Sequence, residues 1–155
     1  MPSQGNIAAE CNFNSSEYLE ELSSLQSLKQ VKVNVVKYKK WTKNVLKAAL
    51  TSGPILPIYK KKFEAVIESH YEFGSCKHKG KIRLHGDWKD HIDFLEGGNI
   101  TQSIDVSLSN GSIGNFTKFK LLLPETRNGE NEVFLATILR ELDFLAPKTR
   151  LINTT

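Results

Sequence analysis

The sequence predicts an α+β fold, in which helices pack on an antiparallel sheet made of two hairpins. Apolar and polar residues alternate on both sides of a turn or short loop in residues 63–86 and 103–123, which is typical of hairpins. Apolar residues recur at helical spacing in residues 16–28, 39–51 and 129–145. With 155 residues, we expect one domain over residues 16–155, following a disordered leader over residues 1–15.

The first part of the domain is predicted to be helix, strand and helix. Leucines recur at helical spacing in Ser16–Leu28, after residues that favour a helix N-cap. Valines alternate with polar residues over Val31–Val35, which predicts a strand. The second helix is expected over Lys39–Thr51, with Trp41 on its apolar side, and Gly53 followed by proline ends it.

The clearest pattern is a hairpin over Phe63–Gly86 with Gly74-Ser75 as its turn. This turn places Glu68 opposite Lys81, and such cross-strand charge pairs contribute ~0.2–1 kcal/mol each. The other expected pairs are Glu72 with Lys77, Glu64 with His85, Ile67 with Ile82 and Ala65 with Leu84. Arg83 faces a valine in this register and has no acidic partner, so we expect it to be free to bind a ligand.

A second hairpin is expected from the alternating segments Ser103–Leu108 and Phe116–Leu123. Residues 92–102 contain two adjacent glycines and are predicted to be an exposed loop. The last helix is expected over residues 129–145, and Leu151-Ile152 is expected to begin another strand. The residues of the broad apolar arc on this helix are Phe134, Leu135, Ile138, Leu139, Leu142 and Leu145.

Composition narrows the classes of function. The net charge of +4 and pI of about 9.0 favour anionic partners mildly, and they fall short of a dedicated nucleic-acid arm. No apolar run approaches the ~20 residues of a membrane span, and no signal peptide is visible, so the cytoplasm is the default location. Cys11 and Cys76 lack a CxxC partner. Two free thiols in a reducing compartment are the preferred interpretation, and a disulfide is the alternative.

All four histidines fall in one short window. The hairpin pattern puts His78 on the face opposite to His70 and His85, so solvated histidines are expected rather than a shared metal site. His85 and Asp87, with His91 nearby, have the composition of an acid–base pair. Because no serine or cysteine nucleophile motif accompanies them, a polar turn at the end of a strand is the preferred interpretation.

Two cations and a glutamate near the last helix are candidates for phosphate binding. A strand lysine paired with a glutamate of the following helix holds nucleotide phosphates in kinases, and Lys120 with Glu141 has this layout. Glu141 is preferred to Glu132, which projects from the solvent side of the helix. Arg127 precedes the helix, whose N-terminus would add backbone donors. The alternative is a solvated basic strand beside a helix-border glutamate.

The run from Ile82 to Ile152 resembles the spore coat protein H (CotH) kinase-like family. The matching pieces are Ile82–His91, Lys118–Leu121, Pro124–Asn128 and the helix from Glu132 to Pro147. The resemblance implies an atypical protein-kinase-like fold, with ATP and Mg²⁺ or Mn²⁺ as ligands and protein serine or threonine as phosphate acceptor. It also implies that Arg83 and Lys120 lie near the nucleotide phosphates, and that Glu141 orients Lys120.

The acidic residues that bind metal and act in catalysis in this family lie further along than residue 155. The sequence therefore predicts the N-terminal part of such a fold. It would bind nucleotide or another phosphorylated anion through Arg83, Lys120 and Arg127, and would not be a complete kinase by itself. The alternative is a non-enzymatic interaction module whose basic sheet face docks an acidic protein, a glycan phosphate or nucleic acid. An enzyme centred on His85, Asp87 and His91 is the third interpretation.

Overall fold

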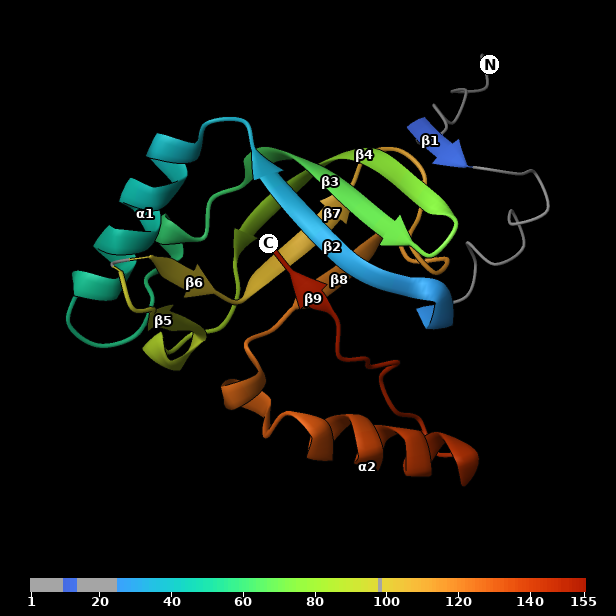
Figure 1. Ribbon diagram of the computed structural model, residues 1–155. Coiled ribbons are helices and arrows are strands. Elements are labelled where there is room, and N and C mark those ends of the chain that lie inside the picture. The colour runs from blue at the N-terminus through green and yellow to red at the C-terminus, as the bar shows by residue number, and fades with distance from the viewer. Residues whose placement is uncertain (1–9, 14–24, 98) are drawn as a thin grey trace, which may run out of the picture.

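A computed structural model describes residues 10–13, 25–97 and 99–155 of the chain. It confirms a mixed α+β fold: Figure 1 shows one curled sheet, with helix α1 at one side and helix α2 beneath it. The sheet order is β8-β7-β4-β3-β2-β9, with β1 also on β4, and β5 and β6 form a separate pair. The strands are β1 (Glu10–Phe13), β2 (Leu28–Val35), β3 (Phe63–Tyr71), β4 (Gly74–Leu84), β5 (Ile92–Phe94), β6 (Ile100–Gln102), β7 (Ile104–Leu108), β8 (Lys118–Leu121) and β9 (Asn153–Thr154). The helices are α1 (Tyr38–Leu50) and α2 (Glu130–Glu141).

The β3–β4 hairpin keeps the predicted faces but not the predicted pairs. Tyr71 lies opposite Gly74, so the turn is Glu72-Phe73 and every partner moves by four residues. Phe73 is buried and stacks on Tyr71, with ring centroids 5.2 Å apart, which favours this turn over the predicted one. Glu68 therefore faces Lys77, with Oε1 and Nζ 3.8 Å apart. An even shift leaves each side chain on its face, so the alternation is confirmed and the register was wrong.

The core lies between the inner face of the sheet and α1. Helix α1 buries Trp41, Val45 and Ala48, and the Trp41 ring meets the edge of Phe63 at 5.1 Å. The inner residues of the sheet in this core include Val31, Ala65, Ile67, Ile82, Leu84, Ile104, Val106 and Leu108. Alternating apolar residues predicted these strands. Helix α1 was also predicted, and it begins and ends one residue before its predicted bounds.

Residues 92–102 do not form the exposed loop that their glycines suggested. They form the β5–β6 hairpin, in which Ile92 is buried and the Leu95 N–H donates to the Asn99 carbonyl at 2.8 Å. The second predicted hairpin is confirmed as β7–β8, and β7 pairs with β4. The β5–β6 hairpin is therefore an excursion between two strands that lie side by side in the sheet.

Helix α2 does not pack its apolar arc on the sheet, and this prediction was wrong. The helix ends at Glu141, and among its described side chains only Ala136 is buried. Phe134 is 67% exposed and Leu142, just beyond the helix, is 62% exposed. Figure 1 shows α2 running beneath the sheet, joined to it by coil at both ends. The Ala136 side of the helix is the one turned inward, so most of the predicted arc is exposed, and Leu139 is half-buried.

The two ends of the described chain each add a short strand to the main sheet, and only the C-terminal one was predicted. Residues 10–13 lie in the predicted leader but form β1, and Cys11 and Cys76 form a disulfide, so the prediction of free thiols was wrong. The predicted helix over residues 16–28 mostly lies outside the described residues. Its last part is a 3₁₀ turn, η3 (Leu25–Ser27), followed by β2. Strand β9 follows the predicted Leu151-Ile152 and pairs in parallel with β2.

Candidate anion-binding site

The outer face of β4, β7 and β8 gathers cations, because every second residue of these strands points away from the core. The outward residues of β4 are Lys77, Lys79, Lys81 and Arg83, all exposed, and β8 adds Lys118 and Lys120. Strand pairing aligns these side chains in rows. Arg83, Asp105 and Lys120 form one row across three strands, and Lys81, Ser107 and Lys118 form the next.

The rows border a shallow hollow of about 380 Å³ in the outer face. The cations in its wall are Lys62, Lys81, Arg83, Lys118 and Lys120. Among the described residues that line it, Asp105 is the only acid. Five cations around one carboxylate give this outer-face hollow a net positive charge, which favours an anionic ligand.

Asp105 holds two side chains of β4 from the neighbouring strand. Its Oδ2 accepts a hydrogen bond from Nε of Arg83 at 2.8 Å, and its Oδ1 lies 2.7 Å from Nδ1 of His85. The expectation that Arg83 has no acidic partner was therefore wrong, because the partner comes from β7 and not from β3. Among the described residues, no group bonds the terminal nitrogens of Arg83, so they remain available to a ligand.

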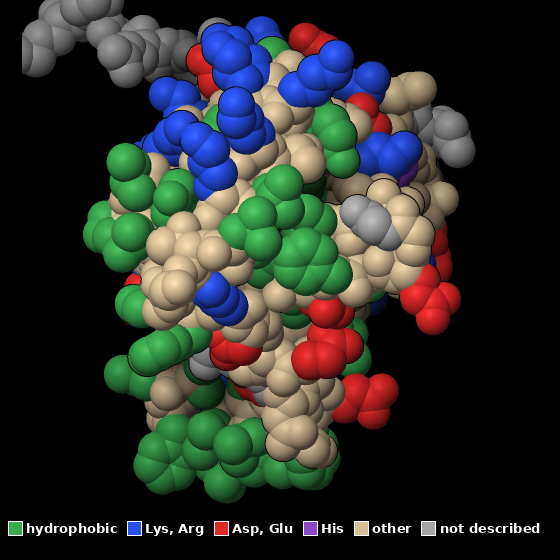
Figure 2. Space-filling view, turned by 90° about the vertical axis from the view of Figure 1, so that its left-hand side faces the viewer, with side chains coloured by type: hydrophobic (Ala, Val, Ile, Leu, Met, Phe, Trp, Pro, Cys, Tyr) green, Lys and Arg blue, Asp and Glu red, His purple; other side chains and the backbone are tan. Residues whose placement is uncertain are grey.

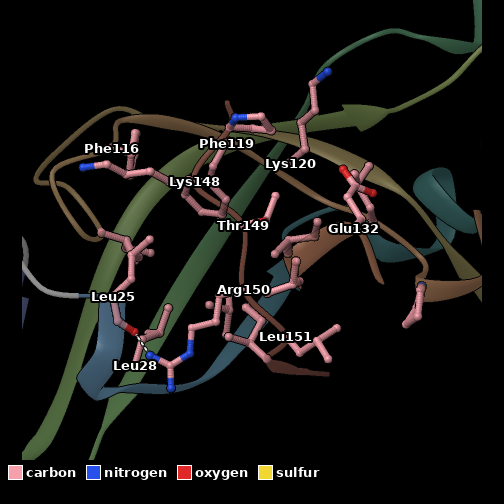
Figure 3. Close-up of a pocket in the computed structure, with 18 of the residues that line it drawn as sticks. Leu25, Leu28, Phe116, Phe119, Lys120, Glu132, Lys148, Thr149, Arg150 and Leu151 are labelled. Carbon is pink, nitrogen blue, oxygen red and sulfur yellow. Dashed lines mark hydrogen bonds between the residues drawn. The ribbon is translucent and has the colours of Figure 1, made fainter. Parts of the chain in front are cut away.

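Lys120 is on the same face as Arg83, but it lacks its predicted glutamate partner. Strand β8 is an edge strand of the main sheet, and among the described residues Lys120 has no carboxylate within ion-pair distance. Glu141 is exposed at the far end of α2, away from the residues around Lys120. Glu132, which the sequence disfavoured, lines a hollow together with Lys120. Figure 3 shows the Lys120 amine pointing away from the Glu132 carboxylate.

This second hollow, of about 600 Å³, lies between β8, α2 and the segment before β9 (Figure 3). Its wall is mostly apolar, including Leu121 and Val133, with Lys118 and Lys120 shared with the outer-face hollow. The Arg150 guanidinium bonds the Leu25 carbonyl in this region. The β8–α2 hollow can therefore take an apolar or aromatic group whose charged end meets the two shared lysines.

Arg127, the third predicted phosphate ligand, lies in the 3₁₀ helix η6 (Pro124–Arg127), just before α2. Its backbone position agrees with the expected place at the start of the helix. Its side chain lies outside the described part of the structure. The outer-face hollow is therefore built without it.

The predicted acid–base residues separate into two interactions. The rings of His85 and His91 meet edge to face at 5.1 Å, and His85 has Asp105 as its carboxylate partner rather than Asp87. Asp87 forms an ion pair with Lys60, whose hydrogen bond and charge lower the pKa of that carboxyl. Gly86 makes the histidine contact feasible, because its φ is +83° and an added Cβ would lie 1.9 Å from the His91 ring.

The described residues offer no metal centre. No group of three or more described His, Cys, Asp or Glu side chains is arranged to hold a metal ion. Both oxygens of Asp105 are already occupied by Arg83 and His85. The outer-face hollow therefore presents cations to a ligand and does not fit Mg²⁺ or Mn²⁺, which need oxygen ligands.

Sequence reasoning missed Asp105 and Lys62 as members of the site. The alternation of Ile104, Asp105 and Val106 does place the carboxylate on the outer face. Nothing local, however, indicates that β7 returns to β4 after the β5–β6 excursion. Without that pairing, Asp105 cannot be assigned to Arg83 and His85.

Comparisons with known proteins do not add a relative. No family model matches the chain, and neither the curated proteins nor the solved structures give a significant match. The resemblance to the CotH kinase-like family therefore stays a prediction.

Proposed function

We propose that this protein binds a phosphorylated anion on the outer face of β4, β7 and β8. The observation that carries the proposal is the outer-face hollow, where five cations surround one carboxylate that is already paired. Arg83 and Lys120, which sequence reasoning selected for phosphate binding, both line it.

The arrangement suits phosphate for two reasons. Asp105 fixes the Arg83 side chain through Nε and leaves the terminal nitrogens for the forked hydrogen bonds that guanidinium groups make with phosphate oxygens. Lys81, Lys118 and Lys120 surround that position as mobile point charges. Because the hollow is shallow, the ligand it fits best is a phosphate group at the end of a larger molecule, or one in a row along a polyanion.

A nucleotide is the second candidate, because Lys118 and Lys120 also line the largely apolar β8–α2 hollow. A base or sugar in that hollow would place phosphates near these two lysines. This agrees with what the resemblance to the CotH-like family implies. Since the described residues supply no metal ligands, any Mg²⁺ would arrive bound to the phosphates.

Calorimetric titration of the full chain with pyrophosphate, with ATP and with Mg·ATP tests both candidates. We expect Arg83→Gln with Lys120→Gln to weaken binding of all three at least about tenfold, because charged hydrogen bonds are lost. Lys43→Gln with Lys47→Gln, on the exposed side of α1, removes the same charge and should leave binding unchanged.

The outcomes separate the candidates. ATP binding much tighter than pyrophosphate, and weakened by Val133→Asp in the β8–α2 hollow, would favour the nucleotide. Equal binding that falls with ionic strength would favour a general phosphate ligand. Equal losses in the α1 and outer-face variants would contradict the proposal, since charge alone would then explain the binding.

A further inference from the structure

A second basic surface lies apart from the outer-face hollow, on helix α1 and the short 3₁₀ helix η4 (Pro57–Tyr59). Residues 25–63 contain ten lysines and no Asp, Glu or Arg. The whole chain carries +4 and this segment +10, so the remaining residues together carry −6. The positive charge of the protein is therefore concentrated in this part of the chain.

The solvent side of α1 combines this charge with exposed apolar groups. The helix buries one side, so the opposite arc carries lysines interleaved with leucines. We define the α1–η4 face by Lys39, Lys43, Lys47, Leu46, Leu50 and Ile58. Leu50 is 74% exposed and Ile58 is 70% exposed. Figure 2 looks onto this side of the molecule and shows Lys and Arg side chains gathered in its upper part, with hydrophobic side chains beside them.

Hydrogen bonds hold η4 against the end of α1. The Asn44 side chain donates to the Tyr59 carbonyl at 2.7 Å, and Thr51 Oγ1 lies 3.2 Å from the Tyr59 hydroxyl. The Ile55 N–H donates to the Asp87 carbonyl at 2.7 Å, which places Trp88, 65% exposed, beside the same segment. The apolar groups of this face therefore lie on a backbone that hydrogen bonds anchor to the rest of the domain.

We propose that the α1–η4 face binds the surface of a bilayer that contains anionic phospholipid. Lysines are attracted to the negative leaflet, and apolar side chains between them enter the boundary between headgroups and acyl chains. Trp88 adds an indole ring, which favours the same boundary region. Nucleic acid would match the lysines but would leave Leu50 and Ile58 in water, and this segment lacks the arginines that dominate base and phosphate recognition.

Co-sedimentation of the full chain with lipid vesicles tests this proposal. We expect binding to vesicles of phosphatidylcholine with about one third phosphatidylserine, and little binding to phosphatidylcholine alone. The triple variant Lys39→Gln, Lys43→Gln, Lys47→Gln should bind about a hundredfold more weakly, on the order of fivefold for each lysine. The pair Leu50→Ser, Ile58→Ser should also weaken binding, at unchanged net charge.

A matched triple variant on the outer sheet face, away from both hollows, is Lys32→Gln, Lys77→Gln, Lys79→Gln; it makes the same change in net charge and should bind vesicles like the wild type. All these side chains are exposed, so thermal unfolding of each variant should match the wild type and show that it folds. Equal losses in the two triple variants would overturn the proposal. It would also be overturned if Leu50→Ser, Ile58→Ser bound vesicles as the wild type does, or if duplex DNA bound this face more tightly than vesicles.

Discussion

Arg83 and Lys120 lie on opposite sides of the same carboxylate, one across the β4–β7 pairing and the other across β7–β8. Asp105 between them bonds Arg83 directly and faces Lys120 in the strand register. The strand register thus places two like charges in a single row with one carboxylate between them. This carboxylate opposes any anion that approaches them, so the strength of the proposed site depends on an acid within it.

The first prediction follows from that opposition. Asp105→Asn should strengthen binding of pyrophosphate about fivefold, because a unit charge a few ångströms from the ligand contributes about 1 kcal/mol in water. The free energy of unfolding should fall by roughly 0.2–1 kcal/mol as the surface ion pair with Arg83 is lost. Calorimetry and urea unfolding measure the two effects. Asp93→Asn, on β5, removes the same charge elsewhere and should not affect binding; weaker binding by Asp105→Asn would argue against the site.

The second prediction concerns pH. Burial lowers the pKa of His78 below its ordinary value of about 6.5, although a hydrogen bond to the Asn110 carbonyl partly offsets this effect. The unfolded chain therefore binds a proton at a higher pH than the folded protein does. His78 therefore lowers the free energy of unfolding in acid, and this decrease begins as the pH falls through about 6.5.

Thermal unfolding between about pH 7.5 and about pH 5.5 checks this sign. The unfolding midpoint of the wild type should drop toward the acid end, and His78→Gln should drop less because its side chain does not titrate. His70→Gln, at a half-buried position on the outer face, is the control and should follow the wild type. A steep curve for His78→Gln would show that another group causes the acid sensitivity.

The third prediction concerns the disulfide between β1 and β4. The bond joins residues 65 positions apart in the sequence. A cross-link of this kind stabilises the folded protein by about 2–4 kcal/mol, because it lowers the conformational entropy of the unfolded chain. Cys11→Ser, which changes an exposed residue, should lower the free energy of unfolding by this amount in urea without reductant. Reductant should lower the stability of the wild type similarly and leave Cys11→Ser unaffected. A wild type insensitive to reductant would contradict the cross-link.

The fourth prediction tests the exposure of α2. Phe134→Ser should change the free energy of unfolding by less than about 0.5 kcal/mol, because the ring is 67% exposed. Ile67→Ala, at a fully buried position on β3, should cost about 2–5 kcal/mol in the same urea titration. Similar losses in the two variants would show that the apolar arc of α2 is covered after all.

The sequence predicted which side chains point in and out, and it failed where distant segments had to be paired. Alternation along β3 and β4 located both faces, because that pattern depends only on the backbone. The turn lies at Glu72-Phe73 and not at the predicted Gly74-Ser75, because this position buries Phe73 against Tyr71. The apolar arc of α2 had the right spacing for a core helix, but spacing cannot tell a helix that meets the sheet from one whose apolar side faces solvent.

The candidate site shows the same division. Arg83 and Lys120 were identifiable as outward cations from local alternation, and they do share one face. Their relation depends on the β4–β7 pairing, which forms only after the chain has made the β5–β6 hairpin. From the sequence, Asp87 was paired with His85 because the two are close in the chain. Glu141 was paired with Lys120 because of its place on the helical wheel. The structure instead gives His85 a partner from another strand, Asp105.

The parallel pairing of β9 with β2 joins Gln30 and Val31 to residues more than 120 positions later. The Val33 N–H also donates to the Thr155 carbonyl at 2.8 Å. A ribosome makes β2 early, so this strand emerges from the exit tunnel long before its partner has been synthesised. Until residues 153–155 emerge, the open edge of β2 can pair with other nascent chains. We therefore expect efficient production of this domain to depend on a factor that covers the open edge of β2 until β9 has been synthesised, such as a chaperone bound to the growing chain.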